Sequence, residues 1–354
     1  MPKGRTPTRP AADYNPPPAW EQMANSSYGA AATRLTIKAS IKGFRRVDYG
    51  ARLLILIAPR TSAAGLALLS VLVLLSGSTG RAAQTPALAP AELVRHMVWN
   101  EMHPDKAAYM FHDRKETPRG SQTKLMVETR DAMAGLIIAV DDHPLSADQR
   151  QAEDERVDRF LKDPGELEKR KKQEKEDTDH TERIVKALPD AFLYEYDGTE
   201  PARKGVGRPG DTLTRLKFRP NPNYDPPSHV EQVLVGMQGY LLIDTFKQRI
   251  ARIDGTLEKE VSFGWGILGH LDRGGHFLVE QGDVGDGHWE ITHMQLAITG
   301  KILLFKSLNF QSDEVESDFR AVPTDLTFAQ GLELLRKQEA VLAEGGESGK
   351  RAEK

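Results

Sequence analysis

Four of the ten histidines fall in a short stretch between His270 and His293, among several acidic residues. Imidazole and carboxylate groups are the ligands that hold catalytic zinc, and three protein ligands are usual. His288 and His293 stand five residues apart in a strand-like run, and odd separations face opposite sides of a strand. His288 and Glu290 could share a face, but a third ligand would have to come from another element. We therefore predict no metal site and keep a metal-assisted hydrolase using the His270–Glu290 region as one alternative function.

Other catalytic signatures are missing from the sequence after Gln84. It contains no Gly-x-Ser-x-Gly elbow and no phosphate-binding glycine loop. The acidic run Gly282–Gly287 lacks the length and the final glutamate of a calcium loop, so a tight hairpin turn is favoured there. We predict no catalytic residue and no cofactor, and a non-enzymatic role is favoured over an enzymatic one.

The segment Ser262–Gly269 alternates glycines with large apolar side chains. One interpretation is a lid over an apolar cavity, or an element that touches lipid. The other is a loop whose aromatic side chains pack into a sheet, with the glycines permitting the bends. The predicted ligand-binding residues are the four large apolar side chains of this segment and one tryptophan further on: Phe263, Trp265, Ile267, Leu268 and Trp289.

The elements that must position these residues are strands. Short strand-like runs cover 108–112, 123–130 and 136–140. In the second run Leu125 and Val127 alternate with Lys124 and Glu128, the period of a sheet with one solvated face. Nine more strands are predicted after Ala191, at 192–196, 212–219, 231–235, 240–244, 249–253, 277–281, 289–298, 302–309 and 316–321.

Glycine-containing turns are predicted between these runs, at 197–198, 236–239, 254–255, 286–287 and 299–301. The connections are too short for parallel crossovers, so the sheet is antiparallel. Strand twist accumulates in so large a sheet until it curls.

Helices are predicted at both ends of the strand region and within it. A first helix covers 91–102, and capping-box sequences at Ser146–Gln149 and Thr327–Gln330 open two others. Asp163 and Pro164 open a further helix that runs to Leu188. No apolar residue occurs between Glu168 and Arg183, which favours a solvated helical face; a partner-binding arm is the alternative interpretation.

The predicted fold is therefore α+β: a large curved antiparallel sheet, or half-open barrel, with a charged helical hairpin insertion at 146–188 and flanking N- and C-terminal helices. Residues 84–343 form a single domain. Residues 344–354 form a disordered tail.

An uncharged stretch, 61–80, precedes the predicted domain. A basic residue before it, an apolar centre at 66–75 and small residues after it are typical of a secretory signal peptide. A retained membrane anchor and a buried core helix are the alternatives. We interpret 61–83 as a signal peptide or anchor and 1–60 as a disordered extension or one that lies upstream of the true translation start. The domain is then expected in the periplasm or cell envelope.

Composition narrows the class of protein. The chain has no cysteine, so disulfide bonds are excluded. The net charge is −3, but residues 1–62 carry ten basic and three acidic side chains, and Arg81 adds one positive charge, which leaves about −11 after Gln84 (−3 − 7 − 1). An acidic domain is a poor partner for phosphate backbones, so no nucleic-acid binding is expected.

The order of elements, together with the local phrases Gly236–Asp244 and Arg249–Gly255, resembles the outer-membrane lipoprotein-sorting proteins and related periplasmic half-barrel proteins. The resemblance covers about 91–310. It implies an open half-barrel whose concave face holds acyl chains, with helices as a plug. No residue-level ligand motif can be transferred, and the charged hairpin is larger than that family would lead us to expect.

The leading functional hypothesis is a non-enzymatic exported protein that binds an apolar ligand, a lipid or lipoprotein acyl chain, on the concave face. Its expected partners are an apolar small molecule or a lipidated protein, with contact to a membrane. The alternatives are an envelope interaction or sensor module that docks through the charged hairpin, and the hydrolase named above.

Overall fold

The computed structural model describes residues 88–104, 106–264, 268–302 and 306–352. The predicted extension at 1–60 and the signal peptide or anchor at 61–83 lie outside these residues. Within the described part of the chain, none of the helices combines the length and the apolar character that a membrane span requires.

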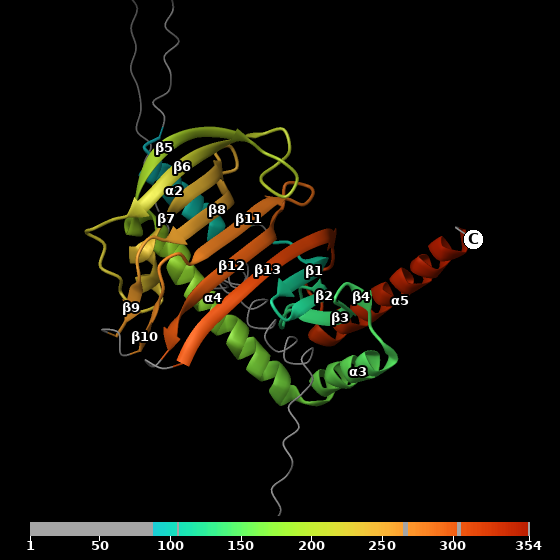
Figure 1. The fold of residues 1–354 in the computed structure, drawn as a ribbon. Coiled ribbons are helices and arrows are strands. Elements are labelled where there is room, and N and C mark those ends of the chain that lie inside the picture. Colours follow the sequence, from blue (N-terminus) through green and yellow to red (C-terminus); the bar gives the residue numbers. More distant parts are fainter. Residues whose placement is uncertain (1–87, 105, 265–267, 303–305, 353–354) are drawn as a thin grey trace, which may run out of the picture.

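A single antiparallel sheet of 13 strands dominates the structure (Figure 1). Eleven strands follow the order β4-β3-β2-β1-β13-β12-β11-β8-β7-β6-β5, and β10 joins β9 to β12. Among the described strands, β4 and β5 are the two ends of this eleven-strand order, and they do not pair with each other. The curved, open antiparallel sheet predicted from the sequence is confirmed.

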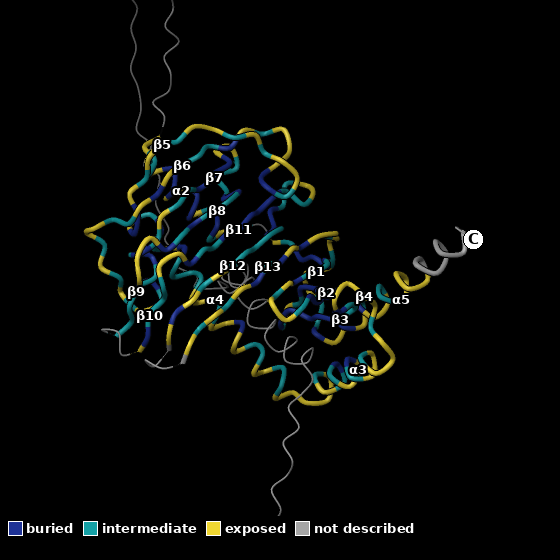
Figure 2. Tube along the Cα trace, in the orientation of Figure 1, coloured by how far each residue is buried: buried dark blue, intermediate teal, exposed yellow. Residues whose placement is uncertain are grey.

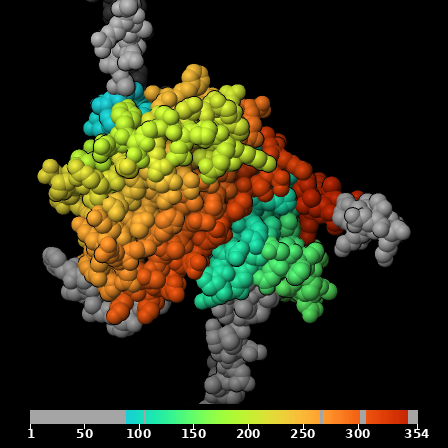
Figure 3. Space-filling view, turned by 45° about the horizontal axis from the view of Figure 1, so that its top comes forward, coloured from blue at the N-terminus to red at the C-terminus, as the bar shows by residue number. Residues whose placement is uncertain are grey.

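The first strands are β1 (Tyr109–Thr117), β2 (Gly120–Val127), β3 (Ala134–Val140), β4 (His143–Pro144), β5 (Phe192–Pro201), β6 (Thr212–Pro220) and β7 (Met237–Asp244). The others are β8 (Arg249–Leu257), β9 (Val261–Phe263), β10 (Gly269–Leu271), β11 (His276–Asp283), β12 (Trp289–Ile302) and β13 (Lys306–Ala321). In the space-filling view, the colours pass in order from the yellow-green of β5 and β6 to the red of β13, so these strands share one continuous surface (Figure 3).

The helices are α2 (Pro90–Glu101), α3 (Ala147–Lys162), α4 (Pro164–Ala191), α5 (Phe328–Ala352) and the 3-10 helix η1 (Glu231–Gly236). The predicted capping box of α3 is present, because Ser146 and Gln149 each bond the other's backbone amide. The Thr327 and Gln330 side chains make the same exchange at α5. Asp163 caps α4 by accepting a bond from the amide of Gly165 at 2.8 Å.

Two apolar clusters lie at opposite ends of the sheet. One packs α2 and the C-terminal turns of α4 against β5–β8, with Leu216 and Ile243 at its centre. The other packs α3 and α5 against β1–β3, around Val157 and Leu335. Helix α4 extends from one to the other, and most of its length is exposed or half-buried (Figure 2).

Several predicted turns are wrong, because glycine serves another purpose there. Asp254-Gly255 lies inside β8 and Gly239 inside β7, where Gly239 and Gly255 face each other across the ladder. A Cβ at Gly239 would lie 1.9 Å from the carbonyl oxygen of Asp254, so these two strands approach more closely than side chains allow. Asp286-Gly287 is a true turn: it lies between β11 and β12, and both residues have positive φ.

Other element predictions are also corrected. The predicted strand at 231–235 is the 3-10 helix η1, and 316–321 is the end of the longer strand β13. Helix α4 continues past Leu188 because Pro189 sits in its last turn. Helix α5 extends to Ala352, beyond the expected start of the tail at 344. Lys124, expected on a solvated face, is 2% exposed.

Candidate functional site

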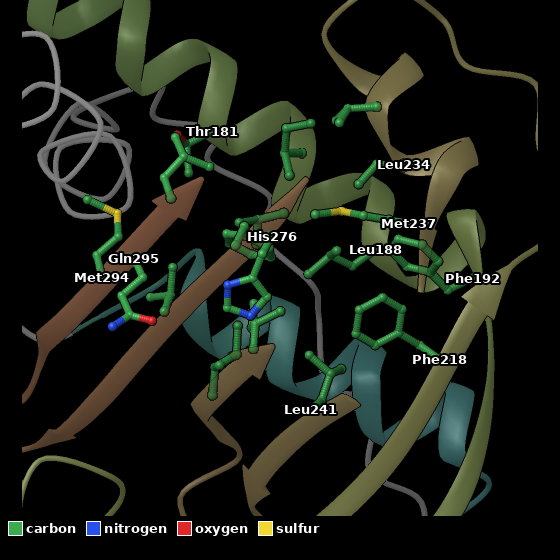
Figure 4. A pocket seen from close by; sticks show the side chains of 18 of the residues that line it. Thr181, Leu188, Phe192, Phe218, Leu234, Met237, Leu241, His276, Met294 and Gln295 are labelled. Carbon is green, nitrogen blue, oxygen red and sulfur yellow. The ribbon is translucent and has the colours of Figure 1, made fainter. Parts of the chain in front are cut away.

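An apolar pocket of about 320 Å³ lies between α4 and the sheet (Figure 4). Its walls come from β5–β8 and β10–β12, its cover from α4 and η1, and one end from the last turn of α2. Natural ligand sites have about this size and this predominantly apolar lining. We call this cavity the α4 pocket.

Strand alternation builds the wall of the α4 pocket. On β11, Phe277 and Val279 face the pocket, and on β12 Met294, Leu296 and Ile298 do the same. These positions are two residues apart, so successive side chains on one face meet the same cavity. The apolar side chains at these positions form a hydrophobic wall.

A missing side chain helps to keep the α4 pocket open. A Cβ at Gly255 would lie 3.2 Å from Phe277, 3.4 Å from Met237 and 3.5 Å from Phe218, all of which line the pocket. Any larger residue at this position would project among those three side chains. Glycine at 255 therefore leaves space for a ligand as well as allowing the close strand approach.

The cover of the α4 pocket is one face of α4. Thr181, Val185 and Leu188 line the pocket at the three- and four-residue spacing of a single helix face, and Ile184 lies beside them. Val185 and Leu188 are buried in the cluster with α2 and β5–β8. The other faces of this helix carry charged side chains in solvent, such as Lys186, which pairs with Glu182.

The α2 end of the α4 pocket is polar. Glu101, the last residue of α2, is 2% exposed, and its Oε1 accepts a hydrogen bond of 2.8 Å from the amide of Ile250. The Nε of Arg249 lies 3.1 Å from the same oxygen. Burial raises the pKa of Glu101, while the charge of Arg249, the Ile250 amide and the Gln281 side chain act in the opposite direction.

Two further polar residues border the pocket near β12, His276 and Gln295 (Figure 4). The Nε2 of His276 lies 3.0 Å from Asp254, and Gln295 donates a 2.6 Å hydrogen bond to Asp313. Both side chains are thus engaged with carboxylates of the sheet, and the chemistry available inside the pocket remains apolar contact and hydrogen bonding.

The three predicted ligand-binding residues that the structure describes do not line the α4 pocket. Trp289 is 8% exposed and packs with Val206, Leu213, Leu242 and Ala251 in a separate cluster. Phe263 ends β9 and is half-buried, and Leu268 is exposed; neither lines the pocket. Trp265 and Ile267 lie outside the described residues.

The histidine-rich region is dispersed over the sheet. Among the described residues, one group could hold a metal ion: Glu260, His270 and Asp272, whose ligand atoms lie within 4.8 Å of one another near β9 and β10. His293 instead lies between Glu280, at 3.2 Å, and Asp313, at 3.0 Å. The hydrogen bond with Glu280 is the chief reason that the pKa of His293 is raised. The hydrolase hypothesis stays a prediction.

The charged hairpin is tied to the rest of the protein at several points. Glu174 of α4 accepts a 3.2 Å bond from the amide of Met133, and Glu153 of α3 accepts a 2.7 Å bond from the amide of Ile137. Exposed pairs such as Lys175–Asp179 keep to α4 itself. A docking role for the exposed part of this helix is untested.

No family model, curated protein or solved structure matches the chain. The likeness to lipoprotein-sorting proteins is thus supported by no relative. The lining of the pocket could in part have been found in the sequence, because the predicted strands at 277–281 and 289–298 contain eight of its lining residues. Glu101 carried no such signal, since it ends an amphipathic helix like many surface glutamates.

Proposed function

We propose that this protein is a non-enzymatic carrier that holds an apolar ligand, a lipid or an acyl chain, in the α4 pocket. The observation that carries the proposal is a cavity of about 320 Å³ whose walls are almost entirely aliphatic, aromatic and methionine side chains. Such surface is costly to leave in contact with water, and a chain of methylene groups gains about 0.8 kcal/mol for each CH₂ it buries there.

The shape of the α4 pocket suits an extended chain. Its lining includes Ile250, near the start of β8, and Leu257, at the end of that strand. At about 3.3 Å per strand residue, these seven steps cover about 23 Å. A long, flexible hydrocarbon fills such a space better than a compact molecule.

The wider role belongs to the same proposal. If the segment 61–83 directs export, the carrier works in the periplasm or cell envelope, takes its ligand from a lipidated protein or a membrane, and has no nucleic-acid partner. The segment Ser262–Gly269 is still predicted to contact ligand or lipid during loading.

Binding of a neutral fluorescent probe tests the proposal. Purified, delipidated protein is titrated with N-phenyl-1-naphthylamine, whose emission rises in apolar surroundings. Saturable binding that an unlabelled long-chain lipid displaces is the expected result. The proposal fails if the probe shows no saturable, displaceable binding.

A matched pair of variants places the binding in the α4 pocket. Gly255→Val adds a branched side chain among Phe218, Met237 and Phe277 and should weaken probe binding by about tenfold, since about 1.4 kcal/mol of lost contact has that effect. Thr256→Val, next along β8 and on its other face, should leave binding unchanged. Circular dichroism and the midpoint of thermal unfolding verify that both variants are folded. Equal binding by both variants would place the probe elsewhere.

A further inference from the structure

One lining residue of the α4 pocket, Glu101, has a buried carboxylate oxygen with unused hydrogen-bonding capacity. Glu101 Oε1 is occupied by the Ile250 amide and by Arg249, whereas Oε2 has no hydrogen-bond partner. Gln281 faces this carboxylate and lowers its pKa, but its amide does not meet the geometry of a hydrogen bond to Oε2. Both Glu101 and Gln281 line the pocket and are at most 3% exposed.

An unpartnered carboxylate oxygen in an apolar cavity is unfavourable, because its lone pairs have lost their hydrogen bonds to water and accept no hydrogen bond from the protein. A ligand group that donates a hydrogen bond removes this deficit at the moment of binding. When Glu101 is ionised, this hydrogen bond is also stronger than one between neutral groups, because the acceptor then carries a charge.

The Glu101 end of the α4 pocket is unfavourable for an acidic head group. Among the described residues that line it there is no lysine and no arginine, and its two acidic residues are Glu101 and Glu182. Arg249 approaches Glu101 from outside the lining and is already paired with it. A ligand carboxylate or phosphate at this end would face Glu101 with no cation to offset the repulsion.

We propose that the α4 pocket selects amphiphiles whose head group donates a hydrogen bond and carries no negative charge, and that Glu101 Oε2 accepts that bond. The ligand class is a long-chain alcohol or amide, with the tail along β8 and the head at the end of α2. This inference rests on the proposed carrier function and specifies which lipids the carrier takes.

Three ligands with the same hydrocarbon chain separate charge from hydrogen-bond donation. Dodecanol, methyl dodecanoate and dodecanoate compete with N-phenyl-1-naphthylamine at about pH 8, where the dodecanoate head is ionised. Dodecanol should bind about tenfold more tightly than the ester, which has no donor, because a hydrogen bond to a charged group is worth about 1.5 kcal/mol or more. Dodecanoate should bind most weakly. Binding of the ester or of dodecanoate as tight as that of dodecanol overturns the inference.

Glu101→Gln keeps the shape of the side chain and an acceptor for the Ile250 amide but removes the charge. In this variant the preference for dodecanol over dodecanoate should fall by about tenfold, chiefly through tighter dodecanoate binding. Glu176→Gln changes an acidic residue of α4 that lies outside the pocket lining and pairs with Lys172, and should keep the wild-type preference. An unchanged preference in Glu101→Gln overturns the role of Glu101, whereas loss of probe binding by the wild type would instead overturn the carrier function.

Discussion

At the scale of single residues, Glu101 concentrates the unusual electrostatics of the α4 pocket. Its carboxylate leaves water almost completely, and the structure compensates one oxygen with a backbone amide and a guanidinium group. Removing a charge from water costs several kcal/mol, and a single well-placed partner recovers only part of that cost. The residue is therefore expected to lower stability while serving the ligand.

The pH dependence of stability tests this expectation. The unfolded chain releases the Glu101 proton near the ordinary pKa of 4.5, whereas burial makes the folded chain hold it to higher pH. Between these values the folded state binds more protons, so the Glu101 contribution to the free energy of unfolding falls as pH rises. Glu101→Gln abolishes this dependence, so its stability relative to wild type should increase as the pH is raised above the ordinary pKa of 4.5. Urea titrations below and above that pH measure the difference, and a constant difference would contradict the burial of an ionisable carboxyl.

At the scale of elements, local sequence determines where the two helices of the α3–α4 hairpin begin. Tertiary contacts hold the hairpin in place along its length. The capping box at Ser146 and the Asp163 cap define where each helix begins. Helix α4 has 28 residues, about 42 Å at 1.5 Å per residue, which is long enough to connect the two apolar clusters. Leu167 near its start and Leu188 near its end join different clusters.

Loss of the N-terminal cap of α3 should lower the stability of the protein only slightly. Ser146→Ala removes the acceptor for the Gln149 amide and should lower the free energy of unfolding by about 1 kcal/mol. Gln151→Ala, an exposed site in the same helix, should change it by less than about 0.5 kcal/mol. Chemical denaturation of both variants supplies the comparison, and equal effects would show that the cap has no special weight.

At the scale of the whole molecule, one sheet joins two apolar clusters, and only the cluster beneath α2 and α4 borders the pocket. Leu188 belongs to that cluster and lines the pocket, while Leu335 of α5 belongs to the other. The sheet continues between them through β11, β12, β13 and β1 without a break in pairing. Substitutions in one cluster should therefore change both stability and ligand binding, whereas substitutions in the other should change stability alone.

A pair of truncations examines that separation. Leu188→Ala and Leu335→Ala each remove buried methyl groups and should each cost about 2–5 kcal/mol of stability. Only Leu188→Ala, which enlarges the pocket, should change the affinity for N-phenyl-1-naphthylamine. Thermal unfolding and probe titration measure the two quantities on the same samples. A shift in affinity of similar size in Leu335→Ala would mean that the two clusters are coupled.

The amino-acid sequence alone determined the class of fold, because the alternation of apolar and polar residues, the helix-capping residues and the short connections are local properties. The starts of α3, α4 and α5 follow from Ser146, Asp163 and Thr327, and the antiparallel pairing follows from the connection lengths. Glycine was misleading as a turn signal. An Asp-Gly pair predicts a turn from the sequence, but in β8 the glycine instead allows two paired strands to approach closely.

Only the tertiary structure decided where a ligand could lie. The α4 pocket is formed by side chains separated by up to about 200 positions, from Glu101 to Ile298, and its hollow depends on which strands become neighbours. Trp289, which stood out in the sequence, packs in a separate apolar cluster, because aromatic side chains fill cores as readily as they line cavities. Whether a glutamate is exposed or buried likewise depends on tertiary contacts. Glu101 ends a helix and is buried only because distant strands of the sheet pack around it.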